Sequence, residues 1–102
     1  FSSYASRKVR ILNKQGVIPE ELTAFTYLSQ FKIDKNSFSG PLPAFLGNFS
    51  EMTYLGLDHN QFSGTIPKEL GNLKNLIMLA ISSNNFSGIL PPELGNLLNM
   101  EL

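Results

Sequence analysis

Residues whose types could do chemistry are few and scattered in this sequence of 102 residues. The one histidine, His59, follows Asp58, and an imidazole beside a carboxylate is a pair that general-base catalysis uses. Neighbouring residues at a strand end point in different directions, so the two are not expected to act as a dyad. The sequence has no nucleophile-elbow serine motif and no glycine-rich phosphate loop. It therefore predicts no catalytic site, and the chain is not expected to be an enzyme.

Composition excludes several other classes of site. The eight basic and eight acidic residues balance, and no basic patch indicates a nucleic-acid partner. Cysteine is absent, and with no cluster of metal-ligating residues we expect neither a metal site nor a cofactor. No apolar run is long enough to cross a bilayer. The sequence starts at Phe1 without a signal-peptide pattern, so we expect a piece of a longer protein, with any membrane attachment in a missing segment of that parent.

Two sequons could accept an N-linked glycan in a secreted protein. They are Asn48-Phe49-Ser50 and Asn85-Phe86-Ser87. The second exists because another asparagine follows Asn84, so it can also arise by chance from the pattern described next. Asn48 and Asn85 are therefore candidate glycosylation sites.

A longer pattern organises the chain and must position any binding residues. Asn36, Asn60 and Asn84 are equally spaced along the sequence, and each begins a segment N-x-F-S-G-x-[IL]-P-x-x-L-G-N. Ahead of each asparagine, apolar residues follow the pattern L-x-x-L-x-L-x-x. A constant period in the range of roughly 20–50 residues is typical of a solenoid. The alternation within each copy predicts short parallel strands near residues 30–34, 54–58 and 78–82.

The whole pattern closely resembles the plant-type leucine-rich repeat. The resemblance implies an α/β leucine-rich-repeat solenoid, with a short-stranded parallel sheet on the concave face and 3₁₀ or irregular segments on the convex face. Segments such as Glu69-Leu70 are too short for a long helix, and a 3₁₀ turn closed by glycine is expected there. The repeated asparagines should be buried and form a ladder of hydrogen bonds to the backbone.

The repeat defines three regions. Residues 25–96 hold three regular 24-residue repeats, and residues 97–102 form the truncated start of a further one. Residues 1–24 form a degenerate N-terminal repeat that keeps its second half. Carrying the constant spacing back one more period places Arg7 in an apolar slot and Leu12 in the asparagine slot, so the first half is expected to be lost. The alternation Val9-x-Ile11 is a competing candidate for a first strand.

The candidate binding site is the outward face of the predicted strands, where residues at equal positions stack in columns about 4.8 Å apart. Tyr54 and Met78 should form a small apolar patch beside Gly56 and Ala80, and such a patch points to contact with a partner. The alternative is a solvated face without a partner. The candidate binding residues are Gln30, Lys32, Asp34, Tyr54, Asp58, His59, Met78 and Ser82.

The resemblance also implies a function. Plant-type repeats most often lie outside the cell in receptor-like kinases, where a single span joins them to a cytoplasmic serine/threonine kinase. Residues 16–28 look like the subgroup that also carries a malectin-like domain. By resemblance, the chain is a scaffold on the extracellular side of the plasma membrane that binds a protein or peptide ligand and a co-receptor. Two alternatives remain, a soluble cell-wall inhibitor of a pathogen hydrolase in the apoplast and a truncated remnant without function.

Overall fold

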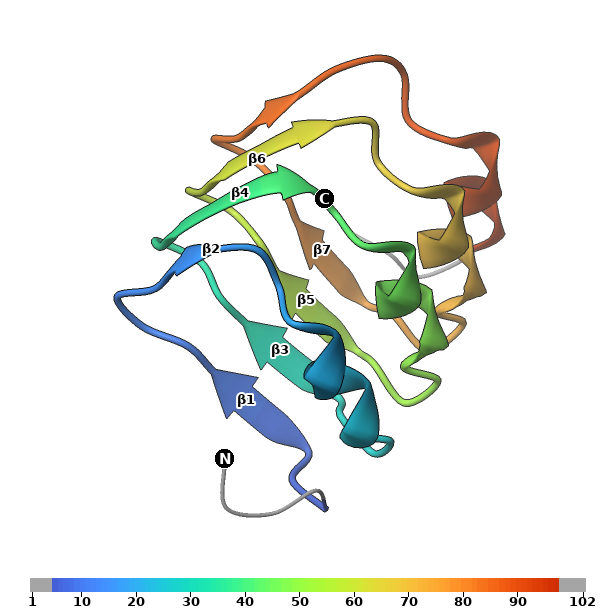
Figure 1. Cartoon of the computed structure of the whole chain (residues 1–102). Coiled ribbons are helices and arrows are strands. Elements are labelled where there is room, and N and C mark those ends of the chain that lie inside the picture. Colours follow the sequence, from blue (N-terminus) through green and yellow to red (C-terminus); the bar gives the residue numbers. More distant parts are fainter. Residues whose placement is uncertain (1–4, 98–102) are drawn as a thin grey trace.

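The structure, a computed structural model, describes residues 5–97, which wind into stacked coils (Figure 1). Each coil passes through a strand of one sheet, a strand of a second sheet and a 3₁₀ helix. Residues 5–97 contain no α-helix, and none of their helices is long and apolar enough to cross a bilayer. The expected start of a further repeat lies outside the described residues, except for Leu97.

The first sheet confirms the predicted parallel strands. It has four strands in the order β1-β3-β5-β7. Phe31 is the register partner of Leu55, and Leu55 that of Leu79, so the pairing follows the sequence repeat. The strands end earlier than predicted, although the N–H of Ile33 still donates to the Gly56 carbonyl at 2.9 Å. Their bounds are Lys8–Arg10 (β1), Gln30–Lys32 (β3), Tyr54–Gly56 (β5) and Met78–Ala80 (β7).

The first coil corrects one expectation, because its first half is present. Val9 is the register partner of Phe31, whereas the constant spacing of the sequence comparison pairs Phe31 with Arg7. Asn13 has a positive φ of 58°, and Lys35 has one of 56°. These two positions are therefore also structurally equivalent, at the same sequence separation as Val9 and Phe31. The coil is thus two residues shorter than the others. The alternation Val9-x-Ile11 indicated the correct strand.

A second sheet was not anticipated by the sequence analysis. It is also parallel, in the order β2-β4-β6-β8, and it flanks the first sheet (Figure 1). The strands β4, β6 and β8 follow the repeated asparagines. The strands β4 and β6 include the whole Phe-Ser-Gly segment, with Gly40 at a φ of +79°, a conformation that glycine adopts without a steric penalty. The strands are Gln15–Gly16 (β2), Ser37–Pro41 (β4), Gln61–Gly64 (β6) and Asn85–Phe86 (β8).

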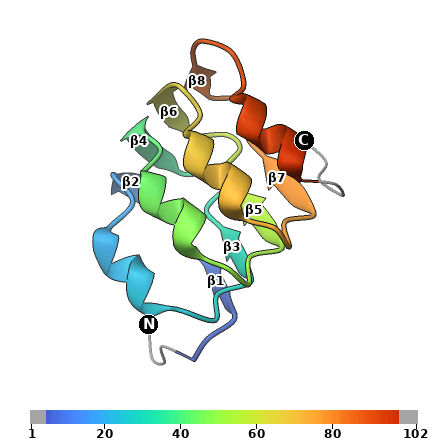
Figure 2. The ribbon, with the colours of Figure 1, turned by 90° about the vertical axis from the view of Figure 1, so that its right-hand side faces the viewer.

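Four 3₁₀ helices form a row along the side opposite the first sheet (Figure 2). An extended proline precedes each of them, as at Pro43 with φ −72° and ψ 140°. The glycine within the helix does not close it through a positive φ, contrary to expectation. A Cβ atom on Gly71 would instead lie 2.7 Å from the Glu93 carbonyl oxygen, so glycine permits close packing of successive coils. The helices are Glu20–Ala24 (η1), Ala44–Asn48 (η2), Lys68–Asn72 (η3) and Pro92–Asn96 (η4).

The core is a continuous apolar layer enclosed by the two sheets and the 3₁₀ helices. The rings of Phe38 and Phe62 are stacked with centroids 6.2 Å apart, and those of Phe62 and Phe86 are stacked at 6.3 Å. Phe31, Leu55 and Phe62 are fully buried. The stacked phenylalanines thus pack on their equivalents in the next coil, whereas the strand register of the second sheet pairs residues that are offset by two positions in the repeat, such as Gly40 with Phe62.

Candidate functional site

Asparagine side chains hold the turns that join the two sheets. The Nδ2 of Asn60 donates to the carbonyls of Ile33 at 2.9 Å, Leu57 at 3.1 Å and Asp58 at 3.2 Å. Its Oδ1 accepts the N–H of Phe38 at 3.1 Å. The side chain therefore satisfies backbone groups in its own coil and in the preceding one.

The same contacts recur on both sides of this buried asparagine. Asn84 donates to Leu57 at 2.9 Å and accepts from Phe62 at 3.0 Å. Asn36 donates to Ile11 at 2.8 Å and accepts from Lys14 at 2.8 Å, which ties the short first coil into the ladder. Asn36 and Asn84 are half-buried, less enclosed than expected. This ladder fixes the ends of the strands that carry the candidate binding face.

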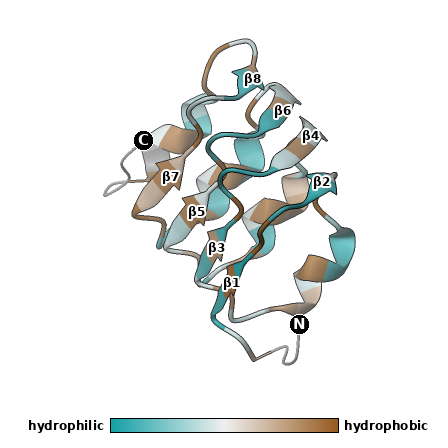
Figure 3. Ribbon diagram, turned by 90° about the vertical axis from the view of Figure 1, so that its left-hand side faces the viewer, coloured by the Kyte–Doolittle hydropathy of each residue, from teal (hydrophilic) through white to brown (hydrophobic). Residues whose placement is uncertain are grey.

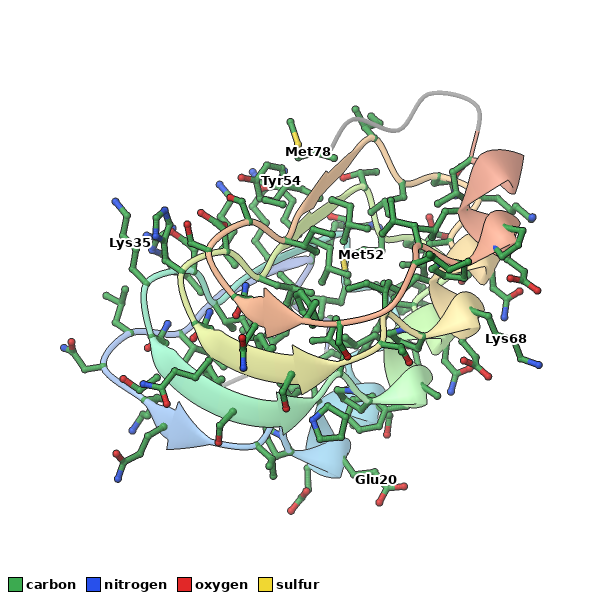
Figure 4. All side chains as sticks on the ribbon, turned by 90° about the horizontal axis from the view of Figure 1, so that it is seen from above. Glu20, Lys35, Met52, Tyr54, Lys68 and Met78 are labelled. Carbon is green, nitrogen blue, oxygen red and sulfur yellow. The ribbon has the colours of Figure 1, made fainter. Side chains whose placement is uncertain are left out.

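The outward side chains of the first sheet form two aligned columns. The strand register gives the columns Lys8, Gln30, Tyr54, Met78 and Arg10, Lys32, Gly56, Ala80. Of the candidate binding residues, all are half-buried except His59 and Ser82, which are exposed at the ends of their strands. Figure 4 shows Tyr54 and Met78 close together on this side, away from Lys68 on the 3₁₀ side.

Tyr54 is held flat against the sheet. A Cβ atom on Gly56 would lie 2.9 Å from Tyr54 Cε1, which means that the ring covers the glycine. From the neighbouring strand, the Lys32 Nζ lies 5.1 Å from the centroid of the ring, within cation–π range. The aromatic ring is thus positioned by a contact on each side.

The charges on the rim of this face are partly paired. Arg10 Nη1 lies 3.7 Å from Asp34 Oδ1, and His59 Nε2 lies 3.9 Å from Asp58 Oδ2. His59 has a φ of 57°, so it forms part of the turn before Asn60. The separation between His59 and Asp58 is an ion-pair distance at a half-exposed site. Among residues 5–97, no three histidine, aspartate or glutamate side chains gather as metal ligands would.

Lys8 and Arg10 belong to the face but were missed by the sequence analysis. Together with Val9, Gln30 and Lys32, they line a shallow depression of ≈ 230 Å³ over β1 and β3. The constant spacing hid them, because it placed the first coil out of register by two residues. Matching Val9-x-Ile11 to Phe31-x-Ile33 would have revealed both.

The repeat and the two-sheet coil decide the family of this chain. The family model Leucine Rich Repeat matches residues 51–73 and 75–97. The chain is a leucine-rich repeat protein. No curated protein matches its sequence.

Several solved plant structures are similar to this leucine-rich repeat chain. The Arabidopsis receptor kinase HAESA, solved with the peptide hormone IDA and the co-receptor SERK1, is 40% identical with a TM-score of 0.82 over 88% of this chain. The BIR2 ectodomain from Arabidopsis thaliana is 29% identical with a TM-score of 0.82 over 84%. A plant ice-binding protein is 34% identical with a TM-score of 0.84 over 89%. The chain covers 15%, 45% and 30% of these three chains, respectively, so it spans less than half of each.

Proposed function

We propose that this chain is a binding scaffold from the extracellular part of a plant leucine-rich-repeat receptor kinase, and that its partner is a peptide or protein. The similar structures support this role, because HAESA was solved with a peptide hormone and a co-receptor. The kinase would belong to a parent protein joined to these repeats.

The observation that carries the proposal is the preorganised Tyr54 on an open sheet face. Its ring is fixed by Gly56 and Lys32, and Met78 is its register partner on β7. Aromatic residues held in this manner are common anchors in interfaces, since little conformational entropy is lost when a partner binds. The 3₁₀ side offers Lys68 as an exposed lysine without an ion pair in residues 5–97.

The test compares the two sides with matched substitutions. Peptides selected for binding to the immobilised chain are titrated against the Tyr54→Ala and Lys68→Ala variants. We expect Tyr54→Ala to weaken binding by about 1–2 kcal/mol, roughly 5- to 30-fold, and Lys68→Ala to have little effect. Weaker binding in the Lys68 variant with the Tyr54 variant unchanged would place the site on the 3₁₀ side.

An extracellular location would also expose the two sequons to glycosylation. Asn48, at the end of η2, and Asn85, in β8, are both exposed. Secretion of the chain from plant cells should therefore add glycan mass that Asn48→Gln and Asn85→Gln remove one site at a time. A secreted chain without added mass at either site would leave both sequons unused.

Ice binding is a second candidate function, favoured by the similarity to the plant ice-binding protein. Ser39 in β4, Ser63 in β6 and Ser87, directly after β8, occupy one repeated position of the sequence. The strand register pairs Pro41 with Ser63 and Ser63 with Asn85, so successive serines are offset by two residues along the sheet. An ice-recrystallisation assay separates the two functions. Inhibition that persists in Tyr54→Ala and is lost in Ser63→Tyr would favour ice binding over the peptide scaffold.

A further inference from the structure

The strand face is divided by charge along the axis of the solenoid. At the β1–β3 end, the two columns present Lys8, Arg10, Gln30 and Lys32, and at the β5–β7 end the side chains are Tyr54, Gly56, Met78 and Ala80. The hydrophobic colour predominates in β7, at the far end of the sheet from β1 (Figure 3). The overall charge is zero, so this division comes from how the fold places the charges.

Cations gather at the β1–β3 end of the sheet because β1, from the short first coil, pairs in register with β3. Six of the eight lysine and arginine residues lie between positions 7 and 35, whereas Glu20 and Glu21 lie on η1, away from this sheet. The depression of ≈ 230 Å³ over β1 and β3 is lined by Lys8, Arg10 and Lys32 and by no carboxylate. Lys8 is exposed and in no ion pair within residues 5–97.

The acidic residues of the face lie to one side of this depression. Asp34 follows β3 and takes up part of the charge of Arg10 at 3.7 Å. Asp58 follows β5 and lies beside His59. Within the two columns, an anionic group would therefore meet net positive charge over Lys8, Arg10 and Lys32, which restricts where on the strand face it can bind.

We infer that this face binds an extended peptide segment that carries an acidic side chain over β1–β3 and an apolar side chain over β5–β7. This inference rests on the proposed function and adds the chemistry and orientation of the partner. The two ends are separated by two strand spacings, about 10 Å, which a chain in the extended polyproline II conformation covers in about three residues, one full turn, so that side chains three residues apart point to the same side. The segment therefore has the pattern acidic-x-x-apolar and runs along the solenoid axis, across the strands. A peptide fits both ends, whereas an acidic polysaccharide fits only the cationic end.

The experiment titrates synthetic peptides into the isotope-labelled chain and follows backbone NMR shifts. The probes are an acetylated, amidated peptide Glu-Ser-Gly-Leu, its reverse-charge analogue Lys-Ser-Gly-Leu, and an oligogalacturonate. The acidic peptide should shift the resonances of both β1–β3 and β5–β7, and a spin label on its glutamate end should broaden β1. Its affinity should fall at least threefold in Lys8→Gln and stay within twofold in Lys68→Gln, a matched loss of one charge.

Each of the other outcomes contradicts one named part of the inference. Equal affinity of the acidic and basic peptides overturns the charge assignment while leaving binding on this face intact. The same holds if the Lys8→Gln variant binds the acidic peptide as tightly as the native chain does. Tighter binding of the oligogalacturonate than of the acidic peptide overturns the assignment of a peptide partner. If none of the probes, nor any selected peptide, shifts the strand face, the proposed function itself is wrong.

Discussion

The Nδ2 of Asn60 donates to the carbonyl oxygen of Ile33, in the preceding coil, at 2.9 Å. The bond joins the points at which the two coils leave the first sheet. Because the next coil provides Asn84 for the same purpose, each turn is secured on both sides. The candidate binding face thus depends on polar contacts at the ends of its strands.

Replacing Asn60 tests this ladder. Asn60→Ala leaves the N–H of Phe38 without its side-chain acceptor and removes one of the two asparagine donors to each of the Ile33 and Leu57 carbonyls, which keep Asn36 and Asn84. We expect a loss of about 1–3 kcal/mol in the free energy of unfolding. The exposed Asn85, whose side chain has no hydrogen bond within residues 5–97, is the control. Asn85→Ala should stay within about 0.5 kcal/mol. Urea unfolding of both variants measures the difference, and equal losses would mean that the ladder adds no stability.

Close packing between coils makes a second prediction. A Cβ atom on Gly71 would lie 2.7 Å from the Glu93 carbonyl oxygen and from Glu93 Cβ, so Gly71→Ala must push η3 away from η4. We expect a destabilisation of about 1–3 kcal/mol, the usual cost of overpacking. Gly95 occupies the equivalent position in η4 with nothing within 4 Å of the added atom.

Gly95→Ala is therefore the matched control and should leave the thermal midpoint nearly unchanged. If both substitutions lower the midpoint by the same amount, the cost belongs to the 3₁₀ helix itself and not to the contact between coils.

The repeat predicted most of this geometry, because a fixed spacing and a few residue types determine a coil that packs on copies of itself. The parallel strands and the family follow from it. The repeat did not predict the first half of the first coil, because two residues are missing between Asn13 and Lys14. The other coils have the ladder asparagine and the residue after it at this point. The second sheet was not predicted because its strands include glycines with positive φ, and such glycines are typical of turns.

The candidate face was harder to predict than the coil. Gln30, Tyr54 and Met78 were aligned by the repeat, but the contact of Lys32 with the Tyr54 ring depends on side-chain directions that no pattern encodes. The cations of β1 joined them only once the register of the first coil was known.

The third prediction is that the stability cost of removing a stacked phenylalanine depends on its position along the solenoid. Phe62 is fully buried between Phe38 and Phe86, whereas Phe86 is half-buried. Phe62→Ala should cost about 3–5 kcal/mol, the range for a large buried aromatic, because it opens a cavity and removes both ring contacts. Phe86→Ala should cost clearly less, because part of its surface already faces water. Denaturant midpoints of the two variants give the order, and a larger loss for Phe86→Ala would contradict the assigned burial.

The last prediction concerns Gly56. Replacing this residue should change the geometry of the candidate binding face while leaving the stability of the fold nearly the same. The atom that an added Cβ would meet most closely is Tyr54 Cε1, at 2.9 Å, the outer part of a ring that can rotate away. The next contact, Lys32 Cα at 3.7 Å, is an ordinary van der Waals distance. Gly56→Ala should therefore lower the free energy of unfolding by less than about 1 kcal/mol, since only a half-exposed ring must move.

Moving the ring should nevertheless change the face. In the native chain the Lys32 Nζ lies 5.1 Å from the ring centroid, so the nearby Lys32 methylene protons should show a ring-current shift. We expect Gly56→Ala to reduce that shift and to weaken binding of the Glu-Ser-Gly-Leu peptide about as much as Tyr54→Ala does. A variant that loses the ring-current shift but binds the peptide as tightly as the native chain would show that the orientation of Tyr54 is not used in binding.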